Sequence, residues 1–100
     1  LPAKTLQGKR ILILENNQTC AEVIQRQLRK WKLDANIIQR VQPALTELNE
    51  NASKSPYDLL IINQQIPNLN SAKLVKEIRV NPKNENLKII FMTLMSSRQK

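Results

Sequence analysis

Tyr57-Asp58-Leu59-Leu60-Ile61-Ile62-Asn63 contains the clearest strand signal in this chain, four consecutive large aliphatic residues that end at an amide. A short continuous apolar run of this kind is typical of a strand that is buried on both faces. Similar runs at 11–14 and 87–93, and a shorter one at 37–38, predict three more strands. Because strands buried on both faces belong to parallel sheets covered by helices, the pattern favours an α/β fold.

Helical periodicity is present in the segments between these runs. Four apolar residues spaced by three, four and three positions predict one helix whose stripe faces the core. The residues of this stripe are Ala21, Ile24, Leu28 and Trp31. A cap at Asn17 or Thr19 suits the start of this helix. A second helix is expected to begin near Pro43, and a third, around 74–79, is expected to end before Pro82.

The predicted order is therefore strand and helix in alternation, with four strands and three helices. This order predicts a doubly wound parallel sheet with helices on both faces. In open sheets of this kind the functional site lies beyond the C-terminal ends of the strands, where the strand order reverses. The residues expected there are Glu15, Asn16, Asn63 and Thr93.

The composition excludes several kinds of site. The chain of 100 residues has no His and one Cys, Cys20, which excludes imidazole catalysis, His-ligated metals and a disulfide framework. The net charge of +8 reflects a shortage of acids, since only Asp34 and Asp58 are aspartates. No apolar run approaches the roughly 20 residues of a membrane span, and the start lacks a signal peptide. We therefore expect a cytoplasmic piece of a longer chain, without membrane contact.

Four segments in order carry a resemblance to a known family. They are 11–17 (Ile-Leu-Ile-Leu-Glu-Asn-Asn), 57–67 (Tyr-Asp-Leu-Leu-Ile-Ile-Asn-Gln-Gln-Ile-Pro), 68–79 and 88–93 (Lys-Ile-Ile-Phe-Met-Thr). Together they resemble the receiver domain of two-component response regulators and hybrid histidine kinases, over residues 8–100. The resemblance implies a flavodoxin-like topology. It also implies a lead-in at 1–9 and a domain at 10–100 that lacks the last strand and helix of the family.

The family's chemistry depends on acids that this chain lacks. In the family, two carboxylates after the first strand and an Asp after the third hold Mg²⁺, and that Asp accepts a phosphoryl group. The matching residues here are Glu15, Asn16 and Asn63. An amide oxygen is uncharged and a poor nucleophile, and one carboxylate makes a thin Mg²⁺ site. The resemblance therefore implies a degenerate acceptor at Asn63, no catalytic residue, no cofactor, and weak or absent Mg²⁺ binding.

Structural interpretations of the same residues remain open. Asn63 also suits a polar strand end that caps a turn, and Glu15 suits a lone solvated acid. Thr93 is either a hydroxyl that contacts a bound anion or a β-branched residue that favours a strand. These structural interpretations require no ligand at this edge of the sheet.

These observations predict a non-phosphorylatable pseudo-receiver, a protein-interaction or regulatory module rather than an enzyme. We expect it to be part of a hybrid sensor histidine kinase, with kinase or other signalling domains of the same chain as partners. A second copy that pairs at the exposed sheet edge is a further candidate partner. The alternative is a basic module that binds nucleic acid or another polyanion, motivated by the charge of +8. No nucleic-acid motif or aromatic platform accompanies that charge, so nucleic acid is not the expected partner.

Overall fold

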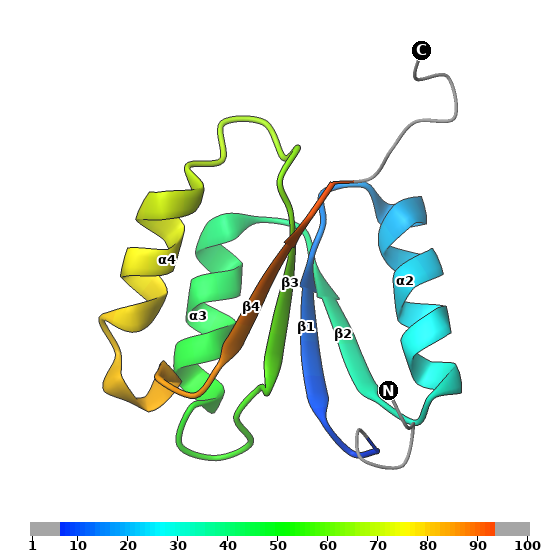
Figure 1. Cartoon of the computed structure of the whole chain (residues 1–100), viewed down its shortest axis with the longest axis horizontal. Coiled ribbons are helices and arrows are strands. Elements are labelled where there is room, and N and C mark those ends of the chain that lie inside the picture. Colours follow the sequence, from blue (N-terminus) through cyan, green and yellow to red (C-terminus); the bar gives the residue numbers. More distant parts are fainter. Residues whose placement is uncertain (1–6, 94–100) are drawn as a thin grey trace.

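Four parallel strands form the sheet in the computed structural model of this protein, which describes residues 7–93 (Figure 1). The strands are β1 (Arg10–Leu14), β2 (Asp34–Ile38), β3 (Leu59–Asn63) and β4 (Lys88–Met92). Their order across the sheet is β2-β1-β3-β4. The predicted α/β fold with a doubly wound parallel sheet is confirmed. The strand order is the flavodoxin-like one, with the last strand of that topology lacking among the described residues.

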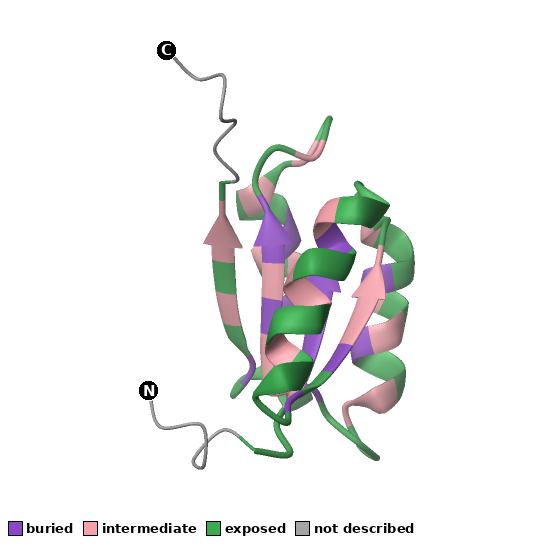
Figure 2. Cartoon of the chain, turned by 90° about the vertical axis from the view of Figure 1, so that its right-hand side faces the viewer, coloured by how far each residue is buried: buried purple, intermediate pink, exposed green. Residues whose placement is uncertain are grey.

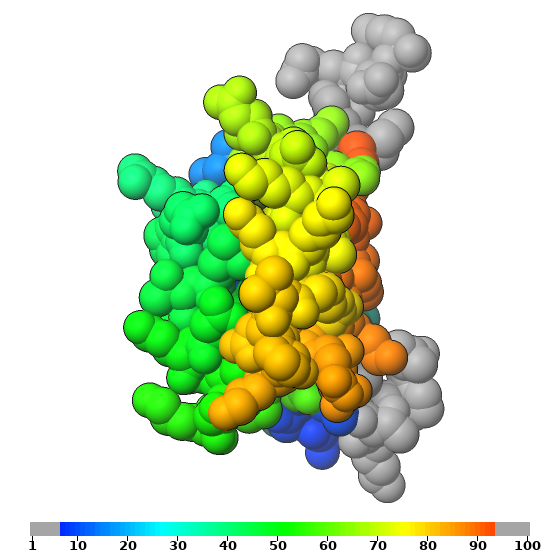
Figure 3. Space-filling model, turned by 90° about the vertical axis from the view of Figure 1, so that its left-hand side faces the viewer, coloured from blue at the N-terminus to red at the C-terminus, as the bar shows by residue number. Residues whose placement is uncertain are grey.

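Three helices cover the sheet. They are α2 (Gln18–Lys30), α3 (Val41–Asn51) and α4 (Ser71–Arg79), with a short 3₁₀ helix η1 (Pro82–Asn84) before β4. α2 lies on one face of the sheet, and α3 and α4 lie side by side on the other (Figures 1 and 3). Asn17 caps α2, because its side-chain oxygen accepts a hydrogen bond from the backbone N–H of Cys20 at 3.0 Å. No helix in the described range 7–93 has the length and apolar character needed to span a bilayer.

Alternate residues of the central strands point into two separate cores. One core lies between the sheet and the helix pair α3 and α4, and the other lies beneath α2. The fully buried strand residues of the first are Leu12, Leu14, Leu60 and Ile62, and those of the second are Ile11, Ile13 and Ala35. β1 is therefore buried on both faces, as its continuous apolar run predicts, whereas β3 is buried on the face of α3 and α4 and only partly buried on the face of α2.

The prediction that Trp31 lies in the core is wrong. α2 ends at Lys30, and Trp31 is its C-cap residue with 46% of its surface exposed. At the start of the same stripe Ala21 is fully buried, whereas Leu28 is only partly buried. The apolar stripe of α2 extends beyond the part of the sheet that the helix covers. Periodicity alone therefore overestimates the burial of Trp31, the last residue of the stripe.

A network of polar side chains lies at the end of the sheet where the strands begin. The hydroxyl of Tyr57 donates a hydrogen bond to Oε2 of Glu47 at 2.8 Å and accepts one from the Asn36 side chain at 3.2 Å. Burial and the hydrogen bond to Glu47 raise the pKa of Tyr57 above its ordinary value. The guanidinium of Arg10 stacks over the Tyr57 ring, with 4.2 Å between its central carbon and the ring centroid.

A second tie joins α3 to the turn before β4. Asn84 is buried, and its side-chain nitrogen donates hydrogen bonds to Oδ1 of Asn49 and to the backbone oxygen of Ile78, both at 3.1 Å. The two acceptors belong to α3 and α4, so one amide connects both helices to η1. Buried amides that are satisfied in this way fix the relative position of the elements that they join.

Candidate functional site

Glu15 directly follows β1, and Asn63 is the last residue of the neighbouring strand β3. In the register of this parallel pair, Leu14 lies opposite Ile62. The residues that come next, Glu15 and Asn63, therefore lie at the same level of the sheet. β1 and β3 are also the strands at which the order reverses, because β2 lies on one side of β1 and β3 on the other. The two side chains therefore lie at the topological switch point, where open α/β sheets bind ligands.

Glu15 is fully buried, which corrects the interpretation of this residue as a solvated acid. Its Oε2 accepts a hydrogen bond from the backbone N–H of Asn17 at 2.8 Å, and its own N–H donates to the oxygen of Ile38 at 3.0 Å. Within residues 7–93 its other oxygen, Oε1, is buried and has no hydrogen-bond partner. A buried acceptor without a partner is uncommon, so Oε1 is the atom of this set that can still accept a hydrogen bond.

Asn63 is also buried, with 6% of its surface exposed. Its side-chain oxygen Oδ1 accepts a hydrogen bond from the backbone N–H of Gln65 at 2.9 Å, which closes an Asx turn after β3. The N–H of Ile66 continues the turn by donating to the backbone oxygen of Asn63 at 3.3 Å. The turn-capping interpretation of Asn63 therefore describes a real contact, and this side chain shapes the loop that follows.

Asn16 and Thr93 are exposed, unlike the two buried residues. Thr93 follows β4, and its hydroxyl donates a hydrogen bond to Oε1 of Gln64 at 3.0 Å. The backbone N–H of Gln64 in turn donates to the oxygen of Met92 at 2.8 Å. Gln64 is not predicted as a site residue from the sequence, although its position directly after Asn63 places it at the strand ends. The Gln64 side chain thus accepts a hydrogen bond from the Thr93 hydroxyl, the group predicted as a possible contact for a bound anion.

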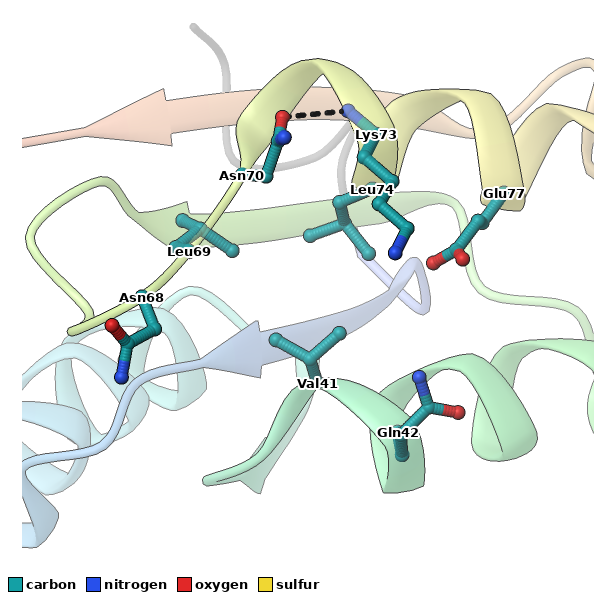
Figure 4. Close-up of a pocket in the computed structure, with 8 residues that line it drawn as sticks. All are labelled: Val41, Gln42, Asn68, Leu69, Asn70, Lys73, Leu74 and Glu77. Carbon is teal, nitrogen blue, oxygen red and sulfur yellow. Dashed lines mark hydrogen bonds between the residues drawn. The ribbon is translucent and has the colours of Figure 1, made fainter.

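A groove of about 280 Å³ lies beside the loop from β3 to α4 (Figure 4). Val41 and Gln42 contribute to it from the start of α3, and Lys73 and Glu77 point toward them from α4. The α4 cap, Asn70, accepts a hydrogen bond from the N–H of Lys73 at 3.0 Å. The groove brings opposite charges together and thus has no marked preference for an anion or a cation.

The chemistry available at the strand ends is limited by the residue types. Glu15 is the one carboxylate in the set formed with Asn16, Asn63, Gln64 and Thr93. No group of three or more His, Cys, Asp or Glu side chains lies together within the described residues. A neutral amide lacks the charge that a carboxylate uses to attack phosphorus. Asn63 can accept a hydrogen bond and shape a turn, and it presents an amide rather than a carboxylate at the end of β3.

The Mg²⁺ ion that the resemblance implies does not fit this set well. Mg²⁺ prefers octahedral oxygen ligands and is usually held by one or two carboxylates together with phosphate and water. Here one carboxylate oxygen of Glu15 is free, while the oxygen of Asn63 is engaged by the N–H of Gln65. One buried carboxylate oxygen does not neutralise a divalent cation, so we derive no chemistry through a metal.

Solved structures share this fold. The receiver domain of the histidine kinase CKI1 from Arabidopsis thaliana, in complex with Mg²⁺ and BeF₃⁻, matches with a TM-score of 0.75 and 21% identity. That match covers 96% of this chain and 74% of the CKI1 chain. The chemotaxis response regulator CheY4 of Vibrio cholerae matches with a TM-score of 0.74 and 16% identity, over 91% of this chain and 72% of the other. At these identities the likeness establishes the fold.

Curated relatives extend the likeness to the sequence. Response regulator ArlR of Staphylococcus saprophyticus is 31% identical over 87 residues, which are 87% of this chain and 36% of that protein. The autoinducer 2 sensor kinase/phosphatase LuxQ of Vibrio vulnificus is 29% identical over 73 residues, which are 73% of this chain and 8% of that protein. The chain thus spans about a third of the first relative and under a tenth of the second.

The family assignment rests on nearly the whole chain. The family model of the response regulator receiver domain matches residues 11–100. This range includes all four strands except Arg10, the first residue of β1. The sheet order, the polar residues at the switch point and the curated relatives agree with that match. This chain belongs to the response regulator receiver domain family.

Proposed function

We propose that this domain is a pseudo-receiver, a receiver that does not accept a phosphoryl group and acts as a protein-interaction or regulatory module in two-component signalling. The family is a family of signalling modules, and the proposal concerns what this member has lost. Its described residues form four strands in the order of the family's fold, but two of the three acids that the resemblance implies are replaced by Asn.

The observation that carries the proposal is Asn63. It is the last residue of β3, at the position that the resemblance assigns to the phosphoryl acceptor, and its side-chain oxygen accepts a hydrogen bond from the N–H of Gln65. Its amide is uncharged, so an attack on phosphorus has no carboxylate to start from. Glu15 does not substitute for it, because Glu15 is fully buried after a different strand.

The test is phosphorylation in solution, followed by intact mass spectrometry. We expect no phosphoryl adduct when the chain is incubated with acetyl phosphate and MgCl₂. A receiver domain with an acceptor Asp, treated in parallel, shows that the donor is active. A stable adduct that disappears in the N63A variant would refute the proposal.

A companion prediction concerns partial restoration. The N63D variant is expected to gain little phosphorylation, because Asn16 still leaves the metal short of one carboxylate. The double variant N16D/N63D is expected to gain more, since it supplies three acids together with Glu15. Robust phosphorylation of N63D at the level of the double variant contradicts this account of the metal.

The parent protein and the cellular location belong to the same proposal. We place the domain in the cytoplasm, within a hybrid sensor histidine kinase, with kinase or other signalling domains of that chain as partners. Support comes from the matches to LuxQ, a sensor kinase/phosphatase, and to the receiver of the histidine kinase CKI1. The full-length coding sequence tests this, and a parent without a kinase region would contradict it.

A further inference from the structure

β2 is the outer strand on one side of the sheet, next to β1 and beside α2 (Figures 1 and 2). The N–H of Asp34 and the oxygen of Ile38 form backbone hydrogen bonds on the β1 side, at 2.9 and 3.0 Å. The backbone groups of successive strand residues point to alternate sides, so those of Ala35 and Ile37 point away from β1. They form the outer edge of β2, where a strand of another chain can pair.

Two side chains of α2 cover the first part of this edge. Nε2 of Gln25 and Nη2 of Arg29 both donate hydrogen bonds to the backbone oxygen of Ala35, at 2.9 and 3.2 Å. A carbonyl oxygen has two lone pairs, so these two donors use its full capacity. Ala35 is also fully buried. Its oxygen is therefore closed to the N–H of an approaching strand.

The same side of α2 also contacts the chain just after β2. Four polar residues of the helix, spaced by four, three and four positions, share this side. They are Gln18, Glu22, Gln25 and Arg29. Nε2 of Gln39, directly after β2, donates to Oε1 of Gln18 at 2.6 Å, and Nε2 of Gln18 donates to Oε2 of Glu22 at 2.8 Å. A polar stripe of α2 thus contacts β2 at Ala35 and just beyond its last residue.

The stability of a single chain gives little reason for two donors on one edge carbonyl. A carbonyl that faces solvent bonds to water, so a side-chain donor in its place gains only about 1 kcal/mol. Long side chains such as Arg and Gln also lose rotamer freedom when they are held in one contact. Protection from other chains is the stronger reason, because an open strand edge pairs readily with another strand.

We propose that Gln25 and Arg29 close the edge of β2 and prevent it from pairing with the β2 edge of a second copy of this chain. The two side chains occupy the outward acceptor at Ala35 and stand in the path of an incoming strand. Only the backbone of Ile37 is then left for pairing, which is too short a segment for a stable ladder. This inference concerns α2 and β2 and holds whether or not Asn63 accepts a phosphoryl group.

The test removes both donors and measures self-association by sedimentation equilibrium. Q25A/R29A is compared with the parent chain and with R26A/Q27A, which removes the same two residue types from the same helix. Arg26 and Gln27 are exposed, and the hydrogen bonds to Ala35 come from the other pair. Alanine favours helix, so both double variants are expected to retain the circular dichroism spectrum of the parent.

We expect Q25A/R29A to dimerise at least about tenfold more tightly than the parent chain or R26A/Q27A, because paired edges gain backbone hydrogen bonds. Association through any other surface is common to all three chains and cancels in the comparison.

Residue-level hydrogen exchange locates the contact. The N–H of Ile37 points outward, so strand pairing at this edge protects it directly. When the concentration of Q25A/R29A is raised, we expect exchange at Ile37 to slow at least about tenfold. The amides of β4, on the far side of the sheet, are expected to respond as they do in the parent chain. In the parent chain itself, exchange at Ile37 is expected to be independent of concentration.

Four results would overturn the inference. Q25A/R29A sediments like the parent chain, R26A/Q27A associates as strongly as Q25A/R29A, association leaves Ile37 unprotected, or the parent chain gains protection at Ile37 at high concentration. The last measurement needs no variant, so it decides the matter even if Q25A/R29A does not fold.

Discussion

Replacing Asn63 by Asp would place a second carboxylate beside Glu15. The two positions follow Leu14 and Ile62, which lie opposite each other in adjacent strands. Both native side chains are buried, with 0% and 6% of their surfaces exposed. Asp keeps the oxygen that accepts the hydrogen bond from Gln65, so the substitution changes the charge and leaves the turn contact in place.

The expected loss of stability follows from this geometry. Neighbouring strands lie about 4.8 Å apart. If the two carboxylates lean apart to about 7 Å, their repulsion is about 2 kcal/mol at an effective dielectric constant of about 20, and a shorter separation gives a larger repulsion. For a domain of this size, that lowers the melting temperature by about 10 °C. We therefore expect N63D to be clearly less stable than the parent chain in the absence of divalent cations.

Thermal unfolding with and without MgCl₂ measures both parts of this prediction. A cation that binds the folded pair of carboxylates stabilises it, so MgCl₂ is expected to recover part of the loss in N63D and more in N16D/N63D. The parent chain is expected to respond little. The control is N70D, the same chemical change at the exposed cap of α4, where a negative charge is favourable.

Three results would refute the reasoning. If N63D melts at the temperature of the parent chain, Glu15 and position 63 do not share a pocket. If N70D loses as much stability as N63D, the effect comes from added charge in general. If MgCl₂ changes neither N63D nor N16D/N63D, the strand ends do not assemble a cation site even when their acids are restored.

Three further predictions concern the polar contacts of the fold. Because the pKa of Tyr57 is raised, its contribution to the free energy of unfolding is expected to be intact below about pH 10 and to decrease above it, where the unfolded chain loses a proton that the folded chain keeps. Y57F should remove that dependence, and ultraviolet titration of this single tyrosine checks it. N84A is expected to lose about 2 kcal/mol in urea unfolding, because one buried and one partly buried hydrogen bond disappear. N17A is expected to lose about 1 kcal/mol in the same assay, since α2 loses its cap.

The fold was predictable because its signals are local and repeated. The aliphatic runs at β1 and β3 are typical of strands in a sheet that helices cover, and the helices between them favour parallel pairing. The meeting of Glu15 and Asn63 follows from the same logic, since consecutive crossovers bring the strand ends to one edge. These inferences require only the order of elements and the direction of each strand.

The remaining contacts depend on distances that periodicity does not encode. The hydrogen bond between Gln64 and Thr93 joins two exposed side chains that follow different strands, and nothing in either local sequence predicts it. Burial of Glu15 depends on how the loop after β1 folds over its carboxylate. The exposure of Trp31 depends on how much of the sheet α2 covers, which no pattern within the helix specifies.

The Asx turn after β3 has a consequence for the history of this domain. Its hydrogen bond uses an oxygen that Asn and Asp both possess, so the backbone of the loop has the same shape with either residue. The hydrogen bond of the turn therefore does not distinguish Asp from Asn at position 63, and the two residues differ for folding only in charge. A lineage can lose the acid without disturbing its scaffold. Restoring an acid at position 63 is expected to destabilise the fold, because the new carboxylate repels that of Glu15 when no cation is bound between them.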